Sequence, residues 1–458
     1  MKLTKMAFAA AALWGIYAGS ALAQQPQMQS AAYTDYYFQE GAAASPSDLA
    51  PAMPGGPMQA GKMIQGPLDG KVADEAVCEP WRLFCQKDCA WNIYGFVAAG
   101  AATNDDGSFF NGPTTFPDYS DMYMNQLYWI TEKATCNDGC GWDWGGRMDI
   151  LYGTDYIFTQ ATGLELNPDG SQGWNDGPFY GLAMPQLYGE VAYNNLGVKV
   201  GHFYTPIGYE VVPATGNFFY SHAYTMQYGE PFTHTGAMAT WSRTEGNSIV
   251  LGLVNGWDHF DRVNDTGALL AGVTWTNGCR LSMSLMGIVS PNEPRNALVT
   301  DTLNTNRNMY SFVLSFQATE RLQYVFQHDN GYQEDGSVMT DGATDAEWYG
   351  INQYLFYTIN DCWKAGARFE WFRDDDGARV GAVRPNNPLS AGGFAGNFYD
   401  IALGLNWSPH ANVLVRPEVR WDWYDGDILA GSNGPFDTGN APGDDEQMLA
   451  AIDVIFLW

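Results

Sequence analysis

Apolar and polar residues alternate along many segments of this chain, with the period of an extended strand. The last twelve residues show the pattern most clearly, because Asp453 lies among alternating apolar residues and the chain ends on Trp458. One apolar face and a terminal aromatic are typical of the strand that closes an outer-membrane β-barrel. Taken alone, the segment fits an ordinary half-buried strand equally well.

Sixteen segments carry this alternation, and the connections between them are short and long in turn. The segments are roughly 91–102, 122–133, 143–155, 184–193, 197–204, 234–241, 247–255, 268–275, 280–289, 309–317, 321–328, 347–359, 362–373, 398–407, 411–422 and 447–458. Short turns on one side and long loops on the other are the signature of an up-and-down barrel. We therefore predict an all-β, transmembrane antiparallel barrel over 91–458, with its short turns and both termini in the periplasm.

Aromatic residues bracket the apolar faces of several predicted strands. Membrane barrels place aromatic girdles at the two lipid interfaces, whereas a soluble sandwich has no reason to do so. We assign six residues to the girdles: Trp363, Trp371, Tyr399, Trp407, Trp421 and Trp458. Pro417 lies inside one predicted strand, where a bulge would accommodate it.

The residues before the barrel form three predicted segments. Residues 1–23 have the charged start, apolar stretch and Ala-Leu-Ala site of a cleaved signal peptide, which exports the chain through the inner membrane. Residues 24–77 are rich in Gln, Ala, Pro, Gly and Ser, which predicts a disordered periplasmic tether. Residues 78–90 form a Cys-rich segment that leads into the barrel. An exported chain without an apolar helical span is either soluble or an outer-membrane barrel.

Composition favours the membrane barrel. Aromatic residues make up 15% of the chain, while the mean hydropathy is only −0.25, as expected for alternating strands around an aqueous lumen. The formal net charge of −29 argues against nucleic acid, because phosphates require clustered Lys and Arg. The expected partners are membrane lipid and lipopolysaccharide, the barrel-assembly machinery, and small hydrophilic solutes or ions.

Charged residues on the polar faces of the predicted strands would line the lumen. With two glutamates of the connection 205–233, the candidate pore-lining residues are Arg147, Lys199, Glu210, Glu230, Lys364, Arg368, Glu370, Arg416, Glu418, Arg420 and Asp453. The connection is rich in aromatics, so we predict that it folds inside the barrel and faces Arg368, Arg416 and Arg420 across a water-filled constriction. Salt-bridge ladders that merely keep the interior polar would use the same side chains, and an external loop or subunit contact would also accommodate the connection.

The seven cysteines all fall on the predicted periplasmic side. Cys136 and Cys140 flank a tight turn, where either a local disulfide or free thiols fit. The spacing of Cys78, Cys85 and Cys89 is not a convincing zinc pattern, and we expect no metal and no cofactor. The chain lacks a Gly-x-Ser-x-Gly elbow, a His-Glu-x-x-His motif and a phosphate loop, so we expect no enzyme activity.

Several short stretches resemble the OmpL-like β-barrel porin family. They are 201–210, 219–222, 230–236 and 416–422, together with 78–84 at the start of the barrel. The resemblance covers about 78–458 and implies an outer-membrane barrel with pore activity. It implies no particular substrate and no catalytic residues.

We therefore expect a porin-like channel for passive diffusion of small hydrophilic solutes, filtered by lumen charges and the infolded connection. Two alternatives stay open at this point. One is a surface adhesin or structural barrel with a plugged lumen, and the other is an outer-membrane hydrolase with a catalytic set at the loop rim. Porins of this size often form homotrimers, although the sequence shows no subunit interface.

Overall fold

The computed structural model describes residues 81–458 apart from a set of short stretches. These are 106–110, 115, 117–120, 138–139, 176, 178, 245, 263–266, 296–299, 301–303, 382–392, 429–433 and 437–444. The predicted signal peptide, the predicted tether and Cys78 lie outside the described residues.

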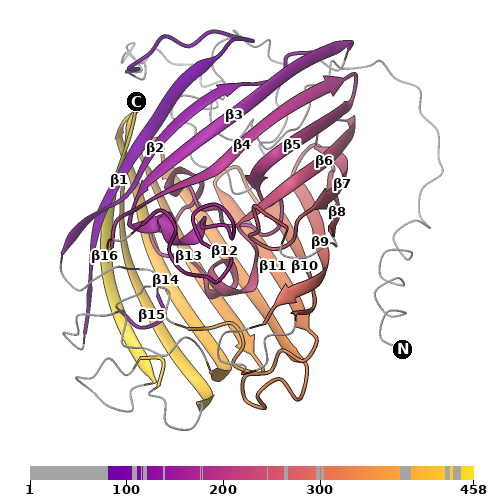
Figure 1. Cartoon of the computed structure of the whole chain (residues 1–458). Helices are drawn as coiled ribbons and strands as arrows, with labels where there is room; N and C mark the ends of the chain where they lie inside the picture. The colour runs from indigo at the N-terminus through magenta and orange to yellow at the C-terminus, as the bar shows by residue number, and fades with distance from the viewer. Residues whose placement is uncertain are drawn as a thin grey trace.

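Sixteen antiparallel strands close into one barrel (Figure 1). They are β1 (Asn92–Asn104), β2 (Met122–Lys133), β3 (Trp142–Gly153), β4 (Gly181–Tyr193), β5 (Leu196–Tyr204), β6 (Thr233–Thr244), β7 (Asn247–Val254), β8 (Ala268–Thr276), β9 (Leu281–Pro294), β10 (Asn304–Gln317), β11 (Leu322–Gln333), β12 (Ala346–Asn360), β13 (Trp363–Asp374), β14 (Phe394–His410), β15 (Val413–Ile428) and β16 (Glu446–Leu457). Each strand pairs with its neighbours in sequence, and β1 pairs with β16 to complete the ring. The predicted barrel of sixteen strands is confirmed.

Side chains alternate between the lumen and the outer surface of the barrel wall. On β13, Arg368 and Glu370 are buried in the interior, whereas Phe369 between them is 38% exposed on the outside. The outer face carries large apolar side chains such as Leu253 and Leu403, which are 69% and 58% exposed. Such exposure would be unfavourable in water, and it suits a surface that contacts lipid chains.

The six aromatic residues assigned to the girdles all lie at outward positions or at the chain end. Trp363 and Trp407, on adjacent strands, stack with ring centroids 5.6 Å apart. Trp421 is 51% exposed. Trp458 follows β16 and packs against Trp129, with centroids 5.4 Å apart.

Pro417 sits inside β15 without the bulge that we expected. Its Cα is in register with Ile452 on β16, and the pairing of β15 with β16 runs without a shift from Val413 to Trp423. On the other side, the pairing with β14 skips Arg416 and Pro417 and resumes in the same register. The missing N–H of Pro417 therefore accompanies a gap of two ladder positions towards β14, and the register is the same on either side of the gap.

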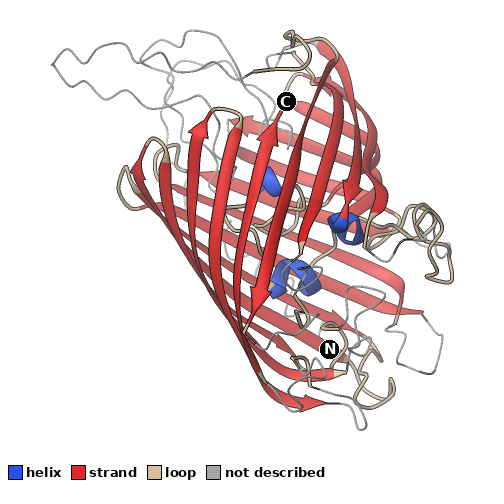
Figure 2. Ribbon diagram, turned by 90° about the vertical axis from the view of Figure 1, so that its left-hand side faces the viewer, coloured by secondary structure: helices blue, strands red, loops and turns tan. Residues whose placement is uncertain are grey.

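The connection between β5 and β6 folds into the lumen, where Figure 2 shows short helical turns inside the ring of strands. This infolded segment, residues 205–232, contains η3 (Ala214–Gly216) and η4 (Thr225–Gly229), and every residue from 219 to 231 is buried. Another turn, η2 (Thr154–Phe158), follows β3 and is largely buried too. None of the helices in the described part of the chain is long and apolar enough to span a membrane.

Residues 81–89 form a strap across the seam where β16 meets β1. The backbone N–H of Trp81 donates to Asn412 Oδ1, and Asn412 Nδ2 donates to the carbonyl of Trp81, both at 2.7 Å. Asn412 Nδ2 also donates to the Leu457 carbonyl at the end of β16 (2.9 Å). The Phe84 ring lies edge-on to Trp458 and Trp129, with centroids 6.4 and 6.0 Å away.

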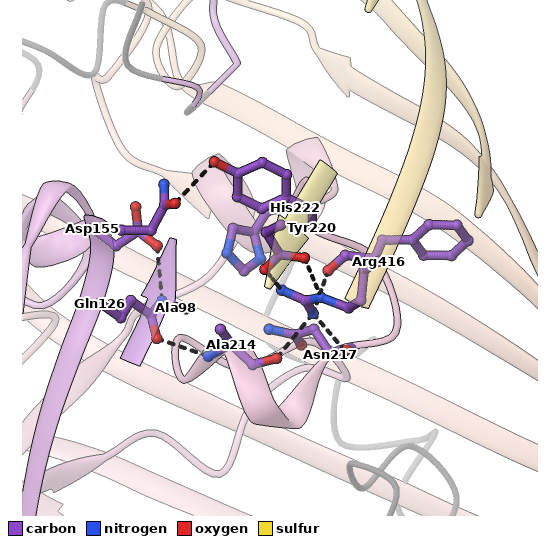
Figure 3. Close-up of a pocket in the computed structure, with 11 residues that line it drawn as sticks. Ala98, Gln126, Asp155, Ala214, Asn217, Tyr220, His222 and Arg416 are labelled. Atoms are coloured by element: carbon purple, nitrogen blue, oxygen red, sulfur yellow. Dashed lines mark hydrogen bonds and ion pairs between the residues drawn. The ribbon is translucent and has the colours of Figure 1, made fainter. Parts of the chain in front are cut away.

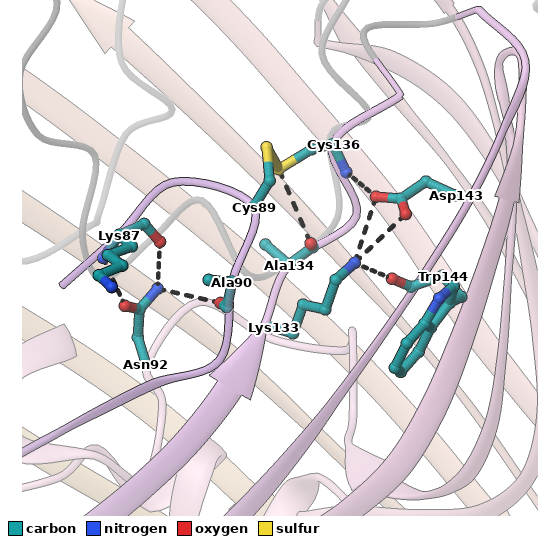
Figure 4. Close-up of a disulfide and its surroundings, with 9 residues drawn as sticks. All are labelled: Lys87, Cys89, Ala90, Asn92, Lys133, Ala134, Cys136, Asp143 and Trp144. Atoms are coloured by element: carbon teal, nitrogen blue, oxygen red, sulfur yellow. Dashed lines mark hydrogen bonds and ion pairs between the residues drawn. A yellow bond between two sulfur atoms is a disulfide. The ribbon is translucent and has the colours of Figure 1, made fainter.

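A disulfide between Cys89 and Cys136 fastens this strap to the turn after β2 (Figure 4). Of the two arrangements considered for Cys136 and Cys140, a local bridge or free thiols, the structure has neither for the pair: Cys136 bonds to Cys89, and Cys140 is exposed and forms no disulfide within the described residues. The pairing of β1 with β2 determines which cysteine lies next to Cys136. It sets Asn92 opposite Glu132, so that Cys89, just before β1, meets the turn just after β2.

We predict that Cys89→Ser lowers the thermal stability of the barrel. The disulfide closes a loop with a sequence separation of 47, for which chain entropy gives up to about 4 kcal/mol. The measurement is the temperature at which the protein loses its heat-modifiable migration in detergent gels, with and without reductant. Cys140→Ser is the matched control and should behave as wild type. Equal transitions for both variants would show that the strap adds no stability.

Candidate functional site

Two acidic residues of the barrel wall hold the infolded segment by its backbone. Glu370 on β13 accepts two backbone N–H groups at the start of η4, both at 2.6 Å, and the hydroxyl of Thr225. Glu418 on β15 accepts two further N–H groups of the segment, at 2.8 and 3.1 Å. An irregular segment inside a barrel has no strand partner for these donors, so charged side chains satisfy them.

Arg416 on β15 binds the carbonyl groups of the same segment (Figure 3). Its guanidinium pairs with Asp453 on β16 at 2.8 and 2.5 Å. It also donates to the carbonyls of Ala214, Asn217 and Phe219, at 2.9, 2.8 and 2.9 Å. One arginine therefore fixes three backbone groups, and Asp453 neutralises its charge.

Arg368 and Arg420 complete the attachment. Arg368 pairs with Glu210 of the segment (3.0 Å) and with Asp400 on β14 (3.1 Å). Arg420 pairs with Asp422 (2.6 Å) and donates to a backbone carbonyl of the segment. The water-filled gap expected between these arginines and the segment is wrong. The side chains are long enough to reach the segment, and a buried guanidinium needs acceptors at hydrogen-bond distance.

Two further candidate cations, Arg147 and Lys199, contact other groups of the barrel wall. Arg147 on β3 pairs with Asp149 (2.7 Å) on the same strand and with Glu132 (3.5 Å) on the adjacent β2. Lys199 lies over the ring of Tyr188, with Nζ 4.1 Å from the centroid. In the described residues, no group of three or more His, Cys, Asp or Glu side chains could hold a metal ion.

Sequence reasoning missed Asp400 and Asp422 as members of this network. Both residues stand between apolar residues in an alternating strand pattern, and this pattern could have placed them on the lumen side. Strand register then sets Glu370 opposite Asp400 and Asp400 opposite Asp422, so three carboxylates form one row across the wall. Arg368 and Arg420 are each two residues from this row along their own strands. Their positive charges offset the negative charge of the three carboxylates.

The two ends of the infolded segment differ electrostatically. Burial raises the pKa of Glu210, but Arg368 and neighbouring hydrogen bonds outweigh it and bring the pKa to about 2. At the other end burial and the adjacent Asp329 raise the pKa of Glu230 well above its usual range. Glu230 accepts a hydrogen bond from Gln327, and no ion pair joins it to a cation of the described chain.

Solvent reaches the described lumen wall mainly near the short turns. Towards the long loops, the inward side chains of the strands are buried against the infolded segment and its neighbours. Half-exposed inward side chains near the short turns include Asn92, Asp143, Thr240, Thr274, Thr276, Ser284, Val313, Gln317, Gln323, Thr358, Lys364, Ser408, Leu414 and Leu457. A small pocket remains between the segment and the wall, lined by polar groups such as Gln126, Asp155 and Arg416 (Figure 3).

Comparison with known proteins agrees with this architecture. Residues 91–458 match the model of the family described as "Putative beta-barrel porin-2, OmpL-like". The chain belongs to this family. As a porin, the protein is a passive channel of the outer membrane, and family and fold point to a channel rather than an enzyme.

Solved structures share the fold at low identity. An anion-selective porin from Comamonas acidovorans is 10% identical, with a TM-score of 0.53 over 81% of this chain and 99% of that chain. The channel DcaP of Acinetobacter baumannii is 14% identical (TM-score 0.49; 80% and 97% covered). The trimer form of OmpT from Vibrio cholerae is 10% identical (TM-score 0.48; 81% and 100% covered). No curated protein matches the chain significantly.

We predict that Arg416→Met destabilises the barrel far more than Arg373→Met. Removing Arg416 leaves Asp453 buried without its cation and frees three carbonyls, at a cost of about 3–5 kcal/mol. Arg373 pairs with Asp375 where both side chains are about one third exposed, so its loss should cost less than about 1 kcal/mol. Denaturant unfolding of the two variants would measure the difference, and equal losses would contradict the attachment role of Arg416.

We also predict that the attachment of the segment weakens as pH rises. The raised pKa of Glu230 means that its neutral form stabilises the fold, so this contribution is present at low pH and lost as pH rises through the raised pKa. Glu230→Gln keeps the neutral form and should flatten the fall in melting temperature as pH rises above the usual pKa range of a glutamate. The exposed Glu320→Gln is the control and should keep the wild-type profile. A wild-type profile for Glu230→Gln would refute this assignment.

Proposed function

We propose that this porin passes small hydrophilic solutes and that the infolded segment 205–232 limits their size. The observation that carries the proposal is the attachment of this segment to β13 and β15 by buried ion pairs and hydrogen bonds. A segment held so firmly across the lumen acts as a fixed steric filter. The long loops then face the outside and the short turns face the periplasm.

The arginines of the wall contribute to this filter by holding it in place. Arg368, Arg416 and Arg420 are each at most 2% exposed, and their charges are offset by adjacent carboxylates. Buried and paired charges create a weaker field in the lumen than free ones. Selectivity therefore depends on the few accessible side chains near the short turns.

A structural or adhesive barrel with a plugged lumen is the second candidate function. The burial of inward side chains towards the long loops favours it. Under the channel proposal the segment stays in place, and solutes pass only through the narrow space that this packing leaves. Small single-channel currents are the expected consequence, whereas the plugged barrel would give none.

The protein's surroundings follow from the same proposal. The apolar outer face contacts lipid and lipopolysaccharide, and the terminal strand with Trp458 presents the signal read by the barrel-assembly machinery. Three barrels would associate through their outer walls; a trimer form is described for OmpT of Vibrio cholerae. Cross-linking in native membranes would test this assembly.

We predict that deletion of residues 211–229 increases single-channel conductance in planar bilayers. The deletion removes the buried part of the segment while β5 and β6 stay joined. Arg416→Glu with Arg420→Glu should act in the same direction, because both changes remove guanidinium groups that donate to backbone carbonyls of the segment. Removal of 24–77 is the control and should leave conductance unchanged. Unchanged conductance in the first two variants would refute the steric filter.

A further inference from the structure

Lys364 is the only cationic side chain that faces the lumen from a described strand and stays half-exposed. The carboxylate of Asp143 on β3 is half-exposed as well, but it pairs with Lys133 at 3.2 Å. The other inward charges are all buried: Glu132, Arg147, Asp149, Glu190, Lys199, Glu293, Arg307, Asp329, Arg368, Glu370, Asp374, Asp400, Arg416, Glu418, Arg420, Asp422 and Asp453. Lys364 is the second residue of β13, close to a short turn, and no ion pair joins it to a carboxylate of the described chain. A solute in this half of the lumen therefore meets one free cation.

Beside Lys364 lies a buried amide with an unsatisfied acceptor. Asn406 is the register partner of Lys364 on β14 and faces the lumen, where it is 4% exposed. Its Oδ1 atom has no hydrogen-bond partner among the described residues. A buried carbonyl oxygen without a donor is unfavourable, and such groups in native proteins call for a specific explanation. A hydroxyl group brought by a solute would satisfy this atom.

An aromatic ring completes the surroundings of these two groups. Phe218 of the infolded segment lies over Gly366, two residues after Lys364, where any Cβ would collide with the ring. The ring packs against Phe356 on β12, with centroids 4.8 Å apart, and stays half-exposed. Gly366 therefore makes room for an apolar surface next to the cation.

We propose that Lys364, Asn406 and Phe218 form a subsite for a small hydroxylated carboxylate, such as a sugar acid. The ammonium group of Lys364 binds the carboxylate, and Asn406 Oδ1 accepts a hydroxyl. The ring of Phe218 packs against the C–H groups of the carbon chain. The subsite deepens the proposed function, on which its role in transport rests, because it names the class of solute that the lumen retains.

Each group excludes a different competitor. A neutral polyol leaves Lys364 without a counter-charge. A fatty acid of the same length leaves the Oδ1 atom of Asn406 unsatisfied. Both are expected to bind about tenfold more weakly than the hydroxylated carboxylate.

Equilibrium binding to the purified, detergent-solubilised protein tests the subsite. Isothermal titration with gluconate, hexanoate and sorbitol compares the complete ligand with one that lacks hydroxyls and one that lacks the carboxylate. We expect gluconate to bind most tightly. Lys364→Gln should reduce gluconate affinity to that of sorbitol, and Asn406→Leu should reduce it to that of hexanoate. Arg280→Gln removes an exposed cation at a short turn and should change nothing.

The subsite is overturned if gluconate binds no better than the other two compounds, or if Lys364→Gln leaves its affinity unchanged. Heat-modifiable gel migration verifies that each variant is folded, and Asn406→Ser replaces the Leu variant if that one fails. Conductance in planar bilayers keeps the two proposals apart. A protein that conducts ions but does not bind gluconate refutes the subsite alone. A protein that binds gluconate but never conducts refutes the transport proposal alone.

Discussion

Every backbone polar group inside a membrane must find its partner within the protein, and this constraint governs the whole structure. The strands meet it through their ladders, and the pairing of β1 with β16 removes the last free edge. The strap of residues 81–89 strengthens this closure, because it connects Asn412, the end of β16 and the turn after β2.

The same constraint explains the chemistry of the lumen. The infolded segment lacks strand partners, so side chains of the wall satisfy its backbone instead. Glu370 and Glu418 accept its N–H groups, and Arg416 donates to its carbonyls. Charged residues that the sequence suggests as a selectivity filter therefore hold the infolded segment in place. Lys364, which no such contact occupies, is left to meet a solute.

Strand positions were predictable because successive residues of a strand face the lumen and the lipid in turn, and are therefore polar and apolar in turn. Thus β2 matches its predicted bounds, and β13 differs from its prediction by one residue at each end. The aromatic content of 205–233 also predicted that the connection packs inside. Predictions failed where the separation of two residues in the sequence was used to infer that they are in contact. Cys136 has Cys140 nearby in sequence, yet it bonds to Cys89.

The sequence by itself determined the class of fold, the strands and the residues that face inward, since a period of two depends only on neighbours along the chain. It also indicated that Arg368, Arg416 and Arg420 share one wall. Only the tertiary structure decided what these residues bind, how Cys89 reaches Cys136, and which lumen charge stays free. These outcomes depend on strand register and on the path of the infolded segment, which bring together residues that lie up to about 200 positions apart.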